Sequence, residues 1–233
     1  MDARALRELE LYELARLYGL DEPGRAASTT AVAEVAATEV AFAPVEIAPG
    51  TDWDALREMV RDCRACGLCR QRKQAVFGVG DAAAPWLFVG EGPGADEDEQ
   101  GEPFVGQAGR LLDSMLSAIG LRRGERVYIA NVVKCRPPGN RTPTAEEAAA
   151  CAPFLDRQIE LLRPKLIVAL GKTAAAHLLA TEASIGSLRG RVHRYRDTPL
   201  VVTYHPAYLL RAPAEKAKVW EDLLFARRTL AAA

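Results

Sequence analysis

The sequence predicts an α/β protein of three layers, with helices on both faces of a central four-stranded, mainly parallel sheet. Two observations support this fold class. Near-continuous apolar runs alternate with segments of helical period, and the runs lie at 86–89, 127–130, 166–170 and 200–203. Strands that are apolar throughout are typical of a parallel sheet covered on both faces. In addition, 49% of the 233 residues are hydrophobic, enough for one full-sized core.

The helices of this body are predicted from periodicity and from their end signals. Thr144 and Glu147 form a capping-box pattern at one start, and Gly120 and Pro164 provide two of the ends. The predicted helices cover 53–62, about 108–119, 144–162, a segment that begins after Gly171, and 214–230.

The N-terminal part differs from this body. Residues 1–24 have the pattern of a short amphipathic helix at 3–18, and residues 25–50 are rich in Ala, Val, Thr and Pro without any period. We interpret them as a helix and a flexible linker in front of a catalytic body at 51–233. We expect the N-terminal helix to dock a protein partner.

Charge and hydropathy limit the class of protein. Residues 1–62 carry 6 basic and 13 acidic groups, a net charge of −7, whereas residues 63–233 carry +6. A basic body permits contact with a polyanion, although this bias alone is weak evidence. No apolar run reaches the ~18 residues of a membrane helix, and glutamates interrupt the N-terminus. We therefore expect a cytoplasmic protein that does not contact a membrane, and we separately expect it to be a monomer.

Five cysteines are the most distinctive residues of the chain. Cys63 and Cys66 form a C-x2-C pair, and Cys135 and Cys151 follow far downstream. Without export, thiols stay reduced, so a metal centre is favoured over disulfides and over unliganded core cysteines. Spacing alone does not decide between an iron–sulfur cluster and zinc. Cys69 extends the pair to C-x2-C-x2-C, and we interpret it as the spare thiol.

A glycine-rich segment, Gly90-Glu91-Gly92-Pro93-Gly94, follows the first predicted strand. Ligands bind beyond the carboxyl ends of parallel strands, and glycines let backbone N–H groups approach them. An acid is unusual in a phosphate-binding loop. Glu91 instead suits a group that handles water or stabilises a cationic transition state. The alternative is a tight turn with a solvated acid.

Further candidates lie at the same predicted edge. Phe104 can stack on a flat ring, and Asn131 has the donor and acceptor that match a pyrimidine edge. His205 follows the fourth strand and can donate to an oxygen that gains negative charge. The segment Leu209-Leu210-Arg211 can contact a duplex. Taken singly, each residue also has an ordinary structural interpretation.

Taken together, these motifs resemble the family-4 uracil-DNA glycosylases, the iron–sulfur branch of the uracil-DNA glycosylase superfamily. The resemblance covers about residues 60–230, in order and with compatible spacings. It is carried by Cys63-x2-Cys66, Gly90-Glu91-Gly92-Pro93-Gly94, Gly101-x-Pro103-Phe104-Val105-Gly106-x-Ala108-Gly109, Asn131-x3-Cys135-Arg136-Pro137-Pro138, Cys151 and His205-Pro206-x-Tyr208-Leu209-Leu210-Arg211.

The resemblance implies an enzyme of base excision repair that hydrolyses the N-glycosidic bond of deoxyuridine in DNA. Uracil would leave the duplex to be reached, and an abasic site would remain. The family also implies a structural [4Fe-4S] cluster. Its ligands would be Cys63, Cys66, Cys135 and Cys151, with Cys69 unassigned.

The same resemblance implies roles for the site residues. Phe104 would stack on the uracil, Asn131 would read its polar edge and reject cytosine, and Gly90 and Gly92 would line the pocket. Glu91 would position the attacking water or stabilise the sugar cation. His205 would stabilise the departing uracil anion. Leu209, Leu210 and Arg211 would support the opened duplex.

Two differences from related branches of the superfamily limit the reaction and the range of bases that we expect. The stretch Arg136–Ala150 contains no His, which favours ordinary turnover over covalent trapping of the substrate. Glu91 favours narrow base specificity. The alternatives are a glycosylase for other deaminated bases and a non-catalytic, metal-bearing nucleic-acid-binding module.

Overall fold

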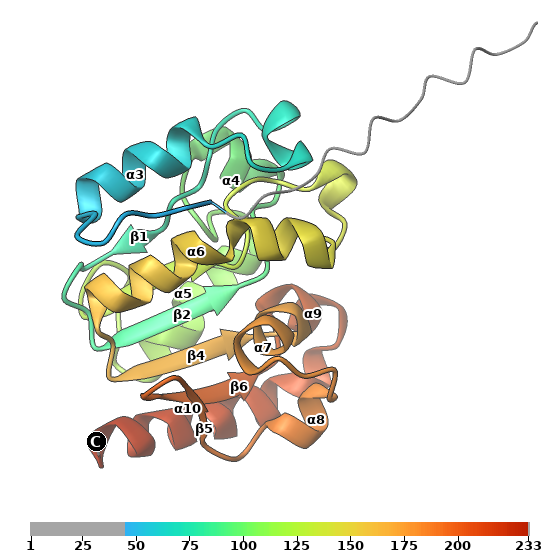
Figure 1. The fold of residues 1–233 in the computed structure, drawn as a ribbon. Helices are drawn as coiled ribbons and strands as arrows, with labels where there is room; N and C mark the ends of the chain where they lie inside the picture. The colour runs from blue at the N-terminus through green and yellow to red at the C-terminus, as the bar shows by residue number, and fades with distance from the viewer. Residues whose placement is uncertain (1–44, 233) are drawn as a thin grey trace, which may run out of the picture. The chain divides into compact units, whose positions relative to one another are not determined.

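The computed structural model describes residues 45–232, whose central feature is a six-stranded sheet in the order β1-β3-β2-β4-β6-β5 (Figure 1). The predicted α/β fold class is confirmed. The four central strands run parallel to one another. They are β3 (Val127–Asn131), β2 (Trp86–Gly90), β4 (Leu166–Leu170) and β6 (Thr198–Thr203).

Two short edge strands correct the predicted strand count. β1 (Val79–Gly80) pairs antiparallel with β3, and β5 (His193–Tyr195) pairs antiparallel with β6. Neither has an apolar run, because strands of two and three residues are too short to show a period. The basic stretch around His193 is therefore an edge strand, where charged side chains also discourage pairing with a further chain.

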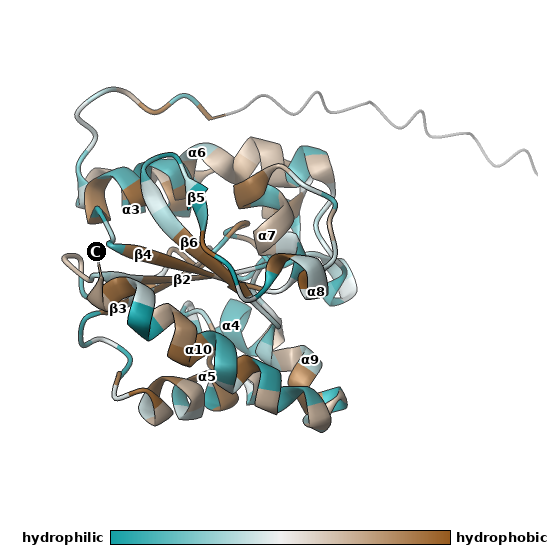
Figure 2. Ribbon diagram, turned by 90° about the horizontal axis from the view of Figure 1, so that it is seen from below, coloured by the Kyte–Doolittle hydropathy of each residue, from teal (hydrophilic) through white to brown (hydrophobic). Residues whose placement is uncertain are grey.

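Helices cover both faces of the sheet, as Figures 1 and 2 show. Strand side chains alternate between two apolar cores, since Leu87 and Val89 join one and Trp86 and Phe88 join the other. The first core packs under α3 (Trp53–Asp62), α6 (Ala145–Leu162), α7 (Lys172–Leu179) and α8 (Ile185–Leu188). The second packs against α5 (Gln107–Ala118), α9 (Pro206–Arg211) and α10 (Lys216–Ala231).

The local signals explain most helix ends. The hydroxyl of Thr144 accepts a hydrogen bond from the N–H of Glu147, and the carboxylate of Glu147 accepts one from the N–H of Thr144, so the predicted capping box is present. Pro164 follows the left-handed Arg163 at the end of α6. The structure adds helices that were not predicted, which are α4 (Ala95–Gln100), α8 and α9, and the 3-10 turns η1 (Gly67–Arg70), η2 (Pro138–Asn140) and η3 (Pro213–Glu215).

The strand register places the candidate residues. Gly90 of β2 pairs with Asn131 of β3, and Leu170 of β4 pairs with Thr203 of β6. The carboxyl ends of all four parallel strands therefore meet at one edge of the sheet. The segments that follow them are brought together there.

The predicted N-terminal helix at 3–18 and most of the predicted linker lie outside the described residues. The last linker residues, 45–50, form no helix or strand, but Val45 and Ile47 are half-buried against the first core. Among the residues that the structure describes, no helix combines the length and the apolar character needed to cross a membrane.

Candidate active site and cysteine cavity

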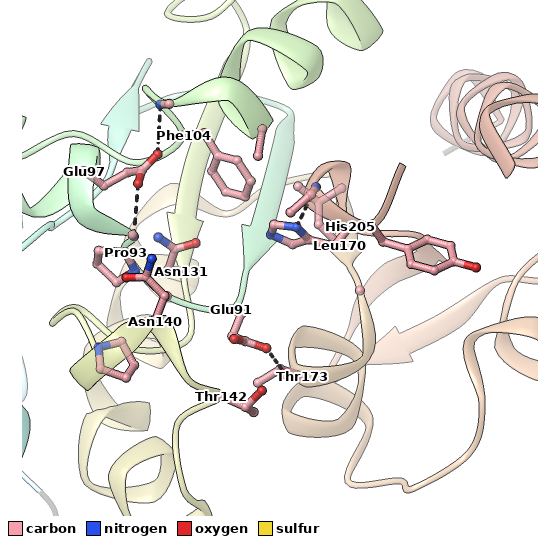
Figure 3. Close-up of a pocket in the computed structure, with 18 of the residues that line it drawn as sticks. Glu91, Pro93, Glu97, Phe104, Asn131, Asn140, Thr142, Leu170, Thr173 and His205 are labelled. Carbon is pink, nitrogen blue, oxygen red and sulfur yellow. Dashed lines mark hydrogen bonds between the residues drawn. The ribbon is translucent and has the colours of Figure 1, made fainter. Parts of the chain in front are cut away.

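A cavity of about 560 Å³ opens at the carboxyl edge of the sheet (Figure 3). Its walls come from the segments after β2, β3, β4 and β6 and from α4 and α5. Glu91, Phe104, Asn131, Thr173 and His205 are among the lining residues. The place agrees with the rule that ligands of parallel sheets bind beyond the strand ends.

Phe104 forms the aromatic wall of this cavity. Its backbone has φ +56°, a left-handed conformation that costs about 1–2 kcal/mol for a residue with a side chain. The guanidinium of Arg123 holds this loop, since it donates to the carbonyl oxygens of Pro103 (2.8 Å) and Phe104 (2.6 Å). Gly109 is required beneath it, because a Cβ there would lie 1.8 Å from the Phe104 oxygen. The ring is thereby fixed 5.4 Å from that of His205.

Asn131 lies at the floor of the cavity and is only 2% exposed. Within residues 45–232 its side-chain oxygen has no hydrogen-bond partner. An unpaired buried polar atom costs about 1–3 kcal/mol, so a polar ligand can recover that energy. Gly90 gives the amide its room, because a Cβ at that position would lie 2.5 Å from Asn131 Oδ1 and from the ring of Phe104.

Glu91 lies on the opposite side of the cavity, directly after β2. One of its carboxylate oxygens, Oε2, accepts a hydrogen bond from the hydroxyl of Thr173 in the first turn of α7 (Figure 3). The other oxygen has no hydrogen-bond partner among the described residues and can face a ligand or a water molecule.

His205 is the N-cap of α9, and its Nδ1 accepts a hydrogen bond from the N–H of Ala207 (3.1 Å). The neutral ring then carries its proton on Nε2. The pKa of His205 is lowered to about 4, mainly by burial and to a smaller extent by the charge of Arg211, while the charge of Glu97 acts in the opposite direction. At neutral pH the site therefore offers an uncharged imidazole donor.

Glu97 ties the two loops of the cavity together. Its carboxylate accepts hydrogen bonds from the N–H groups of Gly94 (3.0 Å), Val105 (2.9 Å) and Gly106 (3.1 Å). One side chain thus connects the glycine-rich loop after β2 with the loop that holds Phe104.

The surface beside the cavity is formed by α9. Tyr208 and Leu210 are 38% and 36% exposed, and Arg211 lines the cavity. Leu209, by contrast, is 1% exposed and packs in the second core. Its burial disagrees with the predicted DNA contact, because Pro206 and Leu209, three residues apart, form the buried side of this short helix. Leu209 supports Leu210 and Arg211 from below.

All five cysteines line a second, smaller cavity between α3, η1 and α6. The guanidinium of Arg72 donates to Cys135 Sγ (2.8 Å), and the N–H of Lys134 lies 3.3 Å from Cys151 Sγ. Burial raises the pKa of Cys135 to about 11 and that of Cys151 to about 12. Within residues 45–232, no three His, Cys, Asp or Glu side chains are arranged to hold a single metal ion.

Comparison with known proteins agrees with this geometry. The family described as the Uracil DNA glycosylase superfamily matches residues 77–224. A type-4 uracil-DNA glycosylase of Pyrobaculum aerophilum is 45% identical over 74% of this chain and 91% of its own length. One from Thermotoga maritima is 48% identical over 71% of this chain and 88% of its own. The chain belongs to the uracil DNA glycosylase superfamily.

The glycosylase fold brings most of the predicted site residues together. Glu91, Gly92, Phe104, Asn131, His205 and Arg211 line one cavity, and Gly90 lies against two of them. The predicted ligands Cys63, Cys66, Cys135 and Cys151 line the other cavity, and Cys69 lies beside them.

Sequence reasoning missed several residues of the glycosylase site. Gly171 and Thr173 follow the third predicted strand, and no motif was assigned to the segment after that strand. The carboxyl end of the strand nevertheless lies at the edge of the sheet where the cavity opens. Glu97 was not among the predicted site residues. The signal for Glu97 was its place three residues after Gly94, where a carboxylate can cap a helix start. Arg123 acts from a loop with no local signal.

Proposed function

We propose that this chain hydrolyses the N-glycosidic bond of deoxyuridine in DNA and releases uracil. The similarity to the type-4 uracil-DNA glycosylases of Pyrobaculum aerophilum and Thermotoga maritima supports this activity. The observation that carries it is the grouping within one cavity of an aromatic wall, an unpaired amide oxygen, a carboxylate and an uncharged imidazole. These are the groups that a flipped pyrimidine and its breaking glycosidic bond need.

The cavity binds the base outside the duplex. A base inside the DNA stack cannot reach Asn131, which is 2% exposed, so the nucleotide has to rotate out at a cost of a few kcal/mol. Stacking on Phe104 and hydrogen bonds to the Asn131 amide offset this cost. Leu210 and Arg211 lie on the surface next to the cavity and support the opened duplex.

Bond cleavage separates charge, and the side chains of Glu91 and His205 each stabilise one of the two charges. As the bond between the sugar C1′ and the uracil N1 breaks, the sugar becomes cationic and the base becomes anionic. Glu91 stabilises the cation and orients a water molecule, whose oxygen bonds to C1′ and whose proton passes to the carboxylate. His205 donates from Nε2 to a carbonyl oxygen of the uracil anion, which then takes a proton from solvent.

The cysteine cavity fits an iron–sulfur cluster. Its donor set is thiols from three separate segments, and three of these sulfurs receive N–H hydrogen bonds. An iron–sulfur cluster of this kind takes four cysteine thiolates, and the cysteines that line the cavity can supply them. Cys63, Cys66, Cys135 and Cys151 would hold it, and its chemistry there is structural.

The cluster would fasten α3 and α6 to the segment after β3. Asn131 lies four residues before Cys135, so an ordered cysteine site also orders the base-reading segment. The prediction of a monomer and that of a protein partner for the N-terminal residues remain predictions.

One experiment tests the activity and the cofactor on the same sample. Purified protein is incubated with duplexes that contain uracil, hypoxanthine, xanthine or cytosine, and iron, sulfide and zinc are measured. We expect uracil release alone, with about four irons per chain. Release of hypoxanthine or xanthine would contradict the narrow specificity. Zinc without iron would contradict the cluster.

A further inference from the structure

The turn between β4 and α7 contacts both residues that we place at the reacting bond. The N–H of Gly171 donates to the carbonyl of Thr203 (2.8 Å), two residues before His205. Gly171 has φ +89°, and a Cβ there would lie 2.8 Å from the Cβ of His205. Two residues later, the hydroxyl of Thr173 donates to Oε2 of Glu91. No role was assigned to this turn from the sequence.

The sheet explains why this turn reaches Glu91. β2 and β4 are adjacent parallel strands, with Val89 paired to Ala169, so their exits lie side by side. Glu91 follows β2 directly and lies beside the first turn of α7, which contains Thr173 (Figure 3). Among residues 45–232, the Thr173 hydroxyl is the one hydrogen-bond donor to the Glu91 side chain.

This contact fixes a side chain that would otherwise rotate. A glutamate has three side-chain torsions, and holding it in one rotamer costs up to about 2 kcal/mol of entropy. A hydrogen bond to a charged group is among the stronger ones in proteins, and it acts here before substrate arrives. Because Oε2 is occupied by Thr173, the lone pairs of Oε1 remain for another donor.

We propose that Thr173 is a positioning residue for the hydrolysis: it holds Glu91 so that Oε1 receives the attacking water. The inference rests on the proposed function of Glu91. Thr173 acts through the carboxylate and does not bind the base, so its loss affects the bond-breaking step rather than substrate affinity.

The test compares three variants. Thr173→Val removes the hydroxyl at nearly constant shape, and Thr173→Ser restores it. Thr181→Val is the matched control, since Thr181 follows the other end of α7 and, among residues 45–232, its hydroxyl is bonded to the N–H of Ala183 alone. Uracil release is measured under single-turnover conditions, and binding is measured with a duplex that carries an uncleavable deoxyuridine analogue.

We expect Thr173→Val to release uracil about 10- to 100-fold more slowly than the parent, the range for losing a hydrogen bond to a charged group. Its affinity for the uncleavable duplex should stay within about two-fold, and Thr173→Ser and Thr181→Val should keep the parent rate within about three-fold. In a Glu91→Gln background, Thr173→Val should slow the reaction no further, because the two residues act as a unit.

Distinct outcomes would overturn the inference. A Thr173→Val rate equal to that of the parent would remove the positioning role. So would an equal loss in the Glu91→Gln background, or a loss found only in duplex affinity. A parent protein that releases no uracil would instead refute the proposed function, and the inference with it.

Discussion

The neutral state of His205 leads to a pH dependence that can be worked out in advance. The pKa of its imidazole is about 4 in the folded protein and about 6.5 in an unfolded chain. Between these values the unfolded chain binds more protons, so the free energy of unfolding falls as the pH falls. From pH 8 to pH 5.5 the linkage relation gives a loss of about 1.4 kcal/mol, an upper value because the ring lines an open cavity.

The assay is urea denaturation of the parent and of His205→Asn at pH 8.0 and 5.5. Asparagine can still cap α9 but does not titrate. All other groups are shared, so the pH-dependent loss of stability should be about 1 to 1.4 kcal/mol larger for the parent. The reasoning would be refuted by equal losses in the two proteins, which would mean that the folded imidazole titrates as it does in the unfolded chain.

Catalysis offers an independent check of the same charge state. A His205 that donates as a neutral ring has the same form from pH 5.5 to pH 8. The ratio of the single-turnover rates of the parent and of His205→Asn should therefore stay constant over this range. A rate ratio that changes with pH, with a midpoint near pH 6.5, would contradict the claim that His205 donates as a neutral ring.

Three further predictions follow from the two cavities. Arg123→Ala frees the loop of Phe104, so we expect KM to rise about ten-fold and the free energy of unfolding to fall by about 2 kcal/mol; an unchanged KM would contradict this role. Gly90→Ala places a methyl group against Asn131 and Phe104, and a folded variant with normal uracil release would show that the base does not bind there. Cys135→Ser should lose most of its iron and Cys69→Ser should keep it, and the reverse result in metal analysis would show that the spare thiol was chosen wrongly.

The parts of the fold that local pattern determines could be predicted. The four parallel strands have continuous apolar runs, and the α6 helix has a capping box, so both were found with nearly correct ends. The edge strands β1 and β5 could not be found, because their pairing with β3 and β6 decides them and their own composition does not.

The candidate site likewise contains residues that a local pattern predicts and residues that only the fold brings into place. Residues within compact motifs, such as Glu91, Phe104, Asn131 and His205, were predicted and share a cavity. Their supports were not predicted, since Arg123 and Thr173 form side-chain hydrogen bonds with Phe104 and Glu91, which lie 19 and 82 residues away in the chain. Leu209 was misjudged because a short motif does not reveal which side of a helix faces the core.

The central claim is that the cavity between Phe104 and His205 holds an extruded uracil. A crystal structure of the iron-containing protein with a duplex carrying a 2′-fluorinated, uncleavable deoxyuridine tests it directly. We predict that the uracil ring stacks on Phe104 and that its polar edge contacts the Asn131 amide. The C1′ atom of the attached sugar should face Glu91. A uracil that stays paired within the duplex, or that lies outside this cavity, would contradict the claim.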